Sequence, residues 1–376
     1  MIEVIAKNCP TYDKETIKLI IHEIFTNQNF FNKLNSLHSV LLKPNLLGAY
    51  APEKGITTHP VFISALIEIL IEYNIKISIL DNPGGTIKFN KVLKECGLVE
   101  LSEKYNIKIL EPVKSGIKKF GDNPEYIISK PFVDCKAIIN LPKLKTHSFT
   151  IFTGAIKNMY GTVPGLAKAN YHRIAPHPTK FAKLVVDIYS IVEDKIVFNL
   201  MDGIIGMDGN GPSSGNTKNF GVILGSYNAV ALDFCASRMM GYNPHKIPTI
   251  KFAAEKSNIA LKNIRLIGDF DENHKIRNVN IRKSKLTNKL LKGLSTPLKG
   301  IIKKLIWTYP YFLPEKCIKC NECVKFCPVS ALSMNNDHPT PLLCIDKCIL
   351  CICCIEICPE NAVYLKKSFL GRFFIK

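Results

Sequence analysis

The chain has 376 residues, of which 47% are hydrophobic and 22% charged, and it contains 14 Cys. This composition excludes a wholly disordered chain, and the length provides a buried core without disulfide stapling. The formal net charge is +19, but a general richness in lysine is weak evidence for nucleic-acid binding. No stretch reaches the roughly 18 apolar residues of a membrane span, and the N-terminal residues lack a signal-peptide pattern. The sequence therefore predicts a cytoplasmic protein.

The first 270 residues alternate short β-branched runs with segments of helical periodicity. This order is typical of an α/β domain with a mostly parallel sheet and flanking helices. We predict strands at 39–42, 75–80, 107–110, 137–141, 196–201 and 220–224, and helices at 60–73, 88–105, 179–192 and 229–240.

Polar residues follow four of these strands, at 43–45, 81–85, 140–147 and 202–215. Ligands of open parallel sheets bind at the carboxyl ends of the strands. Turn formation explains the Gly, Pro, Asn and Asp residues but not the lysines. We therefore predict a site for an anionic small molecule, with phosphate or carboxylate groups, on this edge of the sheet. The catalytic residues are unknown, and the candidates are Lys43, Lys143, Lys145, His147, Lys157 and Asp202.

Two nucleotide fingerprints, G-x-G-x-x-G and G-x-x-x-x-G-K-[ST], are missing from the sequence. The segment 147–177 mixes glycines with His147, His172 and His177, which can donate protons near neutral pH. A single metal ion held by these three histidines is conceivable, but their spacing does not require one. We do not predict such a site.

Ten of the cysteines lie between 317 and 358. The run C-x2-C-x2-C-x3-C-P occurs twice, at 317–328 and 348–359, and the second copy follows the first at an offset of 31 residues. Short spacers of this kind present three thiolates to one face of an iron–sulfur cubane, and the fourth ligand comes from the other copy. Zinc, whose ligand pairs are usually further apart, is the weaker alternative.

The sequence therefore predicts two [4Fe-4S] clusters as cofactors. We assign Cys317, Cys320, Cys323 and Cys358 to the first cluster, and Cys348, Cys351, Cys354 and Cys327 to the second. Cys344 and Cys353 fall outside both registers, and we interpret them as packing residues.

Several stretches resemble the family catalogued as domain of unknown function 362, which is often fused to a dicluster ferredoxin domain. They are Lys-Pro-Asn at 43–45, Asn-Leu-Pro-Lys-Leu-Lys-Thr-His at 140–147, Gly-Ala-Ile-Lys-Asn at 154–158 and Met-Asp-Gly at 201–203. The resemblance covers most of 1–270 and the cysteine motifs. It implies an α/β domain coupled to two [4Fe-4S] clusters, without an established reaction.

Residues 273–314 contain no Asp or Glu and ten Lys or Arg, and apolar residues at helical spacing run from Leu286 to Ile306. Such an amphipathic basic segment can pack between domains or against a partner, or lie on an anionic membrane surface. Nucleic acid is disfavoured because the aromatic residues do not alternate with the basic ones. The predicted units are an α/β domain at 1–270, this connector at 271–313, a small α+β two-cluster ferredoxin-like domain at 314–366 and a basic, aromatic tail at 367–376.

These features favour an iron–sulfur oxidoreductase that passes electrons between a redox partner protein and an anionic substrate on the α/β domain. Two alternatives stay open: a non-catalytic electron carrier or scaffold, and a regulator that senses redox state through its clusters. The location predicted is cytoplasmic, with a peripheral contact at the inner membrane surface left open by the connector.

Overall fold

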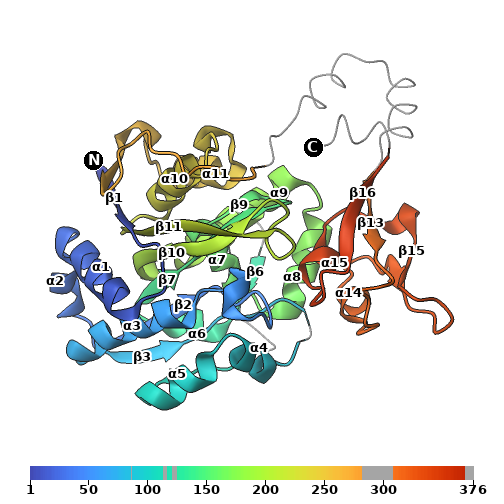
Figure 1. Ribbon diagram of the computed structural model, residues 1–376, viewed down its shortest axis with the longest axis horizontal. Coiled ribbons are helices and arrows are strands. Elements are labelled where there is room, and N and C mark those ends of the chain that lie inside the picture. Colours follow the sequence, from blue (N-terminus) through green and yellow to red (C-terminus); the bar gives the residue numbers. More distant parts are fainter. Residues whose placement is uncertain (86, 113–116, 121–124, 282–307, 369–376) are drawn as a thin grey trace.

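The computed structural model describes residues 1–85, 87–112, 117–120, 125–281 and 308–368 (Figure 1). A sheet of ten strands has the order β12-β1-β11-β10-β7-β2-β3-β4, and β8 and β9 join it beside β10. Strands β10, β7, β2, β3 and β4 are parallel, whereas β11 is antiparallel to both of its neighbours. The strands are β1 (Ile2–Asn8), β2 (Ser39–Pro44), β3 (Lys76–Ile79), β4 (Lys108–Ile109), β7 (Ile138–Leu141), β8 (Lys143–His147), β9 (Ile151–Thr153), β10 (Ile196–Asp208), β11 (Asn216–Ser226) and β12 (Ile264–Gly268).

Helices cover both faces of this sheet, as the alternation of buried side chains requires. In β7, Ile138 faces one hydrophobic core and Ile139 the other. One face carries α1 (Lys14–Asn27), α2 (Phe30–Leu34), α3 (Pro60–Glu72), α4 (Phe89–Glu95) and α5 (Leu98–Tyr105). The other carries α6 (Lys130–Asp134), α7 (Ala155–Asn158), α8 (Gly165–Ile174), α9 (Pro178–Val192), α10 (Ala229–Met239) and α11 (Pro248–Lys256). The predicted class, an α/β domain with a mostly parallel sheet and flanking helices, is confirmed.

Local signals at the helix starts explain several of these boundaries. Pro60 and Pro178 occupy first-turn positions, where the missing N–H costs no hydrogen bond. The side chains of Asp13 and Asn228 accept hydrogen bonds from the first turns of α1 and α10. A hairpin of β5 (Ile117–Phe120) and β6 (Glu125–Ile128) and short 3-10 turns complete this domain.

Two predicted boundaries are wrong, and both errors affect the expected site. The strand expected to end at 201 continues to Asp208, because a bulge between Gly203 and Ile205 keeps the chain in the sheet past the glycine. Residues 143–147, expected in a loop, form β8, which pairs with β10 and β9. Lys143, Lys145, His147 and Asp202 therefore lie inside strands.

The C-terminal unit is small and built from short strands and turns. Strand β13 (Thr308–Phe312) pairs with β16 (Val363–Lys367), and β14 (Leu332–Ser333) pairs with β15 (Leu342–Leu343). Helices α14 (Glu322–Lys325) and α15 (Cys353–Glu356) occupy equivalent places in the two motifs. Strand β13 precedes the predicted start at 314, and its pairing with β16 joins residues 308–312 to this unit.

The predicted amphipathic segment lies mostly at 282–307, and the tail mostly at 369–376, both outside the described residues. Within the described part of the chain, no helix is long and apolar enough to cross a membrane.

Candidate functional site

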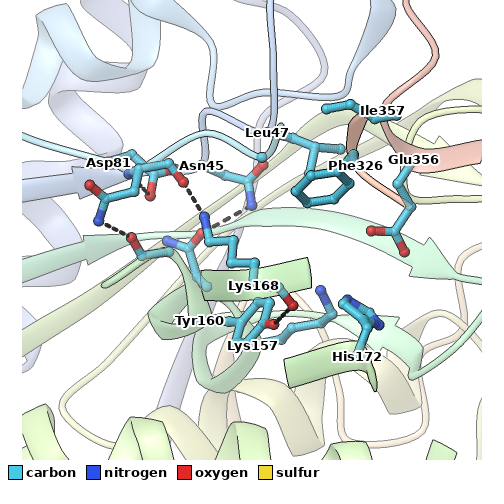
Figure 2. A pocket seen from close by; sticks show the side chains of 14 residues that line it. Asn45, Leu47, Asp81, Lys157, Tyr160, Lys168, His172, Phe326, Glu356 and Ile357 are labelled. Atoms are coloured by element: carbon cyan, nitrogen blue, oxygen red, sulfur yellow. Dashed lines mark hydrogen bonds between the residues drawn. The ribbon is translucent and has the colours of Figure 1, made fainter. Parts of the chain in front are cut away.

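A cavity of about 70 Å³ lies between the large domain and the second cysteine motif (Figure 2). Its walls come from the segments after β2 and β3, from α7 and α8, and from the ends of α14 and α15. The lining residues are Asn45, Leu47, Asp81, Asn82, Gly84, Lys157, Asn158, Tyr160, Gly161, Lys168, His172, Phe326, Glu356 and Ile357. The cavity thus lies at the carboxyl ends of parallel strands, where the sequence predicts a ligand.

Two of the predicted lysines are paired with carboxylates inside the large domain. Lys43 Nζ lies 2.7 Å from Asp81 Oδ1, and Lys143 Nζ lies 2.7 Å from Asp202 Oδ2. Burial lowers the pKa of Lys43 and of Lys143, and the paired aspartates oppose this effect. Tyr12 completes the second pair, because its hydroxyl donates to Asp202 and accepts from Lys143.

The expectation that these residues lie at an accessible edge is therefore wrong. Lys43, Lys143 and Asp202 have no exposed surface, and Lys145 is only 1% exposed. Lys143 and Asp202 do not line the cavity, and they form an ion pair with each other. Because both groups are buried, each needs the other as its counter-charge, and the pair is a structural element of the domain.

The asparagines of the motifs form a chain of buried amides across the strand ends. Asn45 donates to Asn158, Asn158 donates to Asn140, and Asn140 donates to Asn199. Asn158 also donates to the carbonyl oxygen of Lys43. Each of these asparagine side chains both donates and accepts a hydrogen bond. The network therefore fixes the relative positions of β2, β7, β10 and α7.

The Gly-Ala-Ile-Lys-Asn stretch is held by a carboxylate that the sequence analysis did not identify. Asp233 of α10 accepts hydrogen bonds from the backbone N–H groups of Ala155 and Ile156, at 2.5 and 3.0 Å. A Cβ on Gly154 would lie 2.0 Å from Asp233 Oδ1, so only glycine permits this approach. The arrangement presents Lys157 to the cavity.

Three further lysines near the cavity lack a carboxylate within ion-pair distance in the described residues. Lys145 donates to Asn45 Oδ1 and to the Ile56 carbonyl oxygen, and Lys168 donates to the Asn82 carbonyl oxygen. Burial lowers the pKa of Lys168 to about 7 and the pKa of Lys145 well below its usual value. Burial also lowers the pKa of Lys157, which makes no hydrogen bond or ion pair with another described residue. Of these three lysines, Lys157 and Lys168 line the cavity, and neither forms an ion pair within the described residues.

The two buried histidines have different places. His147 Nδ1 accepts from the backbone N–H groups of Phe149 and Thr150, and its Nε2 lies 3.4 Å from Glu356 Oε1. His172 lines the cavity and stacks on Phe181 at 4.2 Å between ring centroids. Burial lowers the pKa of His172 to about 3, so this ring is neutral at physiological pH. His177 instead caps α9 at the surface.

Glu356, the only acidic residue besides Asp81 in the cavity wall, comes from the small domain. The sequence analysis did not select it, although the internal duplication contains a signal. At the offset of 31 residues, Glu356 corresponds to Lys325 of the first motif, which is exposed. The change from Lys325 to Glu356 places a negative charge in the second motif, at the position that faces the lysines of the large domain.

Other contacts hold the small domain against the large one at this point. Tyr50 Oη and Ser213 Oγ each donate to the Glu356 carbonyl oxygen at 3.3 Å, and Ser214 Oγ donates to Asn361 Oδ1 at 3.0 Å. Ile357 packs over Gly85, where a Cβ would lie 2.3 Å from Ile357 Cδ1. The second cysteine motif thus contributes polar and apolar contacts to the large domain, and Phe326 of the first motif lies beside them in the cavity wall.

The cysteines surround two separate cavities in the small domain. Cys317, Cys320, Cys323 and Cys358 line one of them. Cys327, Cys348, Cys351 and Cys354 line the other, together with Cys353. Each cavity therefore receives the three predicted ligands of one motif and the cysteine before the proline of the other motif, and Cys353 is an additional thiol of the second cavity.

The backbone repeats this arrangement in both copies. Lys319 and Leu350 have φ of 53° and 55°, and Asn321 and Ile352 have φ of 68° and 59°. These left-handed residues turn the short spacers so that three thiols face the same cavity. The N–H groups of Ala331 and Ala362 donate to the sulfurs of Cys327 and Cys358, both at 3.2 Å. Such hydrogen bonds stabilise thiolate ligands.

Within the described residues, no three His, Cys, Asp or Glu side chains converge as a single metal ion would require. The thiols instead stand around a space, which is the arrangement that a polynuclear cluster needs. The four predicted ligand thiols of each space fit a [4Fe-4S] cubane.

Comparison with known families agrees with this chemistry. Residues 310–333 match the 4Fe-4S binding domain, and residues 40–238 match the domain of unknown function DUF362. The fold and the cysteine site thus define an iron–sulfur protein of the electron-transfer class. The chain belongs to the DUF362 family, whose match covers more than half of it and includes all four stretches that carried the resemblance.

One curated relative is a thylakoid-associated protein of Synechocystis sp., with 31% identity over 214 residues, 56% of this chain and 65% of the relative. The chain thus spans less than two thirds of that relative. Among solved structures, the lactate racemase apoprotein from Thermoanaerobacterium thermosaccharolyticum has 14% identity and a TM-score of 0.37, over 60% of this chain and 54% of that one. A Thermotoga maritima protein has 11% identity and a TM-score of 0.38, over 65% and 59% of the two chains.

Proposed function

We propose that the protein carries two [4Fe-4S] clusters and passes electrons between a redox partner protein and an anionic small molecule held in the cavity between its domains. The first cluster is ligated by Cys317, Cys320, Cys323 and Cys358, and the second by Cys348, Cys351, Cys354 and Cys327. Each cluster exchanges one electron when bound, so the pair can exchange two.

The observation that carries this proposal is the position of the cavity beside both motifs. Phe326 and Ile357 line the cavity, and they directly precede Cys327 and Cys358. Glu356 lies between Cys354 and Cys358 in the sequence. A molecule in the cavity would therefore lie beside Phe326 and Ile357, and each of these residues is adjacent in the sequence to a proposed ligand of one cluster.

The large domain supplies the chemistry for holding such a molecule. Lys157 and Lys168 bring positive charge to the cavity, and the asparagine network keeps its walls in place. In a buried site of this kind, an ammonium group attracts an anion more strongly than at the surface. A protein that only carried electrons between partners would not need these residues.

The first test is the metal content of anaerobically purified protein. We expect about eight iron and eight sulfide per chain, because two complete motifs each hold a four-iron cubane. About four iron, or stoichiometric zinc, would contradict two clusters. With the clusters reduced, a saturating small anion should shift their electron paramagnetic resonance spectrum, and an unchanged spectrum would favour the electron carrier.

The ligand assignment is tested by two single substitutions. Cys358→Ser should damage the cluster of the first motif, and Cys327→Ser the cluster of the second, each giving a three-iron signal or a lost cluster. A Cys344→Ala, Cys353→Ala background excludes rescue by a neighbouring thiol, which matters because Cys353 lines the second cavity. Loss confined to the mutated residue's own motif would refute the crossed ligation.

We further propose a peripheral contact between the basic connector and an anionic membrane surface. Its support is the composition of residues 273–314 and the name of the thylakoid-associated relative. Intact protein should then sediment with anionic vesicles at low salt and be released at high salt. Absence of sedimentation at low salt would leave the connector as an interdomain element.

A further inference from the structure

Two polar groups on the same side of the cavity have unmet hydrogen-bonding capacity. Lys157 Nζ has no hydrogen bond or ion pair with another described residue. Glu356 Oε1 lies 3.4 Å from His147 Nε2 but accepts no hydrogen bond within the described part of the chain. Figure 2 shows both side chains on the side of the cavity near His172, whereas Lys168 lies on the side of Asp81. Lys157 and Glu356 are close but not ion-paired, so a small molecule between them would satisfy both.

The remaining walls limit what this molecule can be. Leu47, Phe326 and Ile357 give the cavity an apolar side, and its volume of about 70 Å³ is small. The occupant is therefore a short molecule with little carbon. A simple anion would satisfy Lys157 but would place negative charge against Glu356, which is unfavourable in a buried site.

We infer that the cavity binds a short carboxylic acid that carries a hydrogen-bond donor, a hydroxyl or an ammonium group, on the carbon next to its carboxylate. The carboxylate would contact Lys157, with Lys168 contributing charge from the other side, and the donor would contact Glu356. The inference rests on the proposed function in one respect, because it names the class of the anionic small molecule in the same cavity.

A matched series of acids tests this inference. Oxidised, iron-loaded protein is titrated anaerobically by calorimetry with acetate, glycolate and glycine, which differ only in the group next to the carboxylate. Glycolate or glycine should bind at least about tenfold more tightly than acetate, because a buried acceptor left unpaired disfavours the analogue that lacks the donor. A preference for glycine over glycolate identifies the donor as ammonium, and the reverse preference as hydroxyl. Equal affinity for all three acids, or no binding, overturns the inference.

Two substitutions locate the contacts. Glu356→Met should lower the affinity for the tighter-binding acid to that for acetate. Lys157→Met should lower the affinity for all three acids by about tenfold. Lys325→Met is the matched control for Glu356→Met, since it lies at the equivalent position of the first motif and is exposed. Exposed Lys180, changed to Met, is the control for Lys157. A Glu356→Met protein that still prefers the donor-bearing acid overturns the assignment of Glu356.

The design separates this inference from the proposed function. Iron content and the reduced-cluster spectrum report on the clusters in every variant, and acid binding is measured without electron transfer. Normal clusters without acid discrimination would defeat the inference alone. If Glu356→Met loses iron, the acid series on the unmodified protein still tests whether the cavity prefers an acid with a hydrogen-bond donor.

Discussion

The buried lysines of the large domain form two groups that differ in their partners. Lys43 and Lys143 each lie 2.7 Å from an aspartate, and neither is exposed. Lys145, Lys157 and Lys168 are held by neutral oxygens or by no described hydrogen-bond acceptor. In the first group the charge is balanced by a carboxylate inside the domain. In the second group no described carboxylate pairs with the lysine, and Lys157 and Lys168 line the cavity where a ligand would contact them.

This comparison teaches that a motif lysine is not by itself a ligand-binding residue. Lys143 and Lys145 are two residues apart in β8, yet Lys143 meets Asp202 and Lys145 meets the side chain of Asn45 and the carbonyl oxygen of Ile56. Desolvation is costly for both, but only the paired lysine has a carboxylate that offsets part of this cost.

Asp202→Ala should destabilise the large domain by about 3 to 5 kcal/mol, because it leaves Lys143 buried without a counter-charge. The substitution also removes the acceptor for the Tyr12 hydroxyl and for the backbone N–H of His59. Urea unfolding of the iron-loaded protein measures the change. The double variant Asp202→Ala, Lys143→Met should recover much of the loss, and a single variant of unchanged stability would show that the pair is not structural.

Acid binding should weaken as pH rises through about 7, because burial lowers the pKa of Lys168 to about 7. Below this pH the group is an ammonium that attracts a carboxylate, and above it a neutral amine. The charged groups that influence Lys168 are Asp81, Lys43, Lys157 and Glu356. Glycolate keeps the same charge from pH 6 to 9, so calorimetry over that range isolates the protein.

The expected change in glycolate affinity is about tenfold over this range, comparable to one charge-assisted hydrogen bond. Lys168→Met should bind glycolate weakly and without the step near pH 7. If the step persists in Lys168→Met, another group is responsible and the assignment to Lys168 is wrong.

Lys157→Met should change the free energy of unfolding by less than about 1 kcal/mol, or raise it, since no described ion pair or hydrogen bond is broken and a desolvated charge is removed. Thermal unfolding of the iron-loaded variant, with Lys180→Met as control, measures this. A loss near that of Asp202→Ala would place Lys157 in the structural group and contradict its role in ligand binding.

The sequence by itself determined the class of the large domain and the candidate cluster ligands. Alternating strand and helix patterns follow from local periodicity, and the cysteine run specifies its chemistry through spacing alone. Lys157 was also a candidate from sequence, because it lies in a segment that mixes titratable residues with glycines. Its surroundings were not predicted, since Asp233 and Glu356 are far from it in the chain.

Only the tertiary structure decided which polar residues share a site. Pairing of Lys143 with Asp202 depends on the register of β8 against β10, and a bulge displaced the strand end that sequence reasoning expected. Glu356 enters the cavity because its part of the second cysteine motif packs on the large domain. Such contacts between distant segments depend on packing and desolvation, which local sequence patterns do not encode.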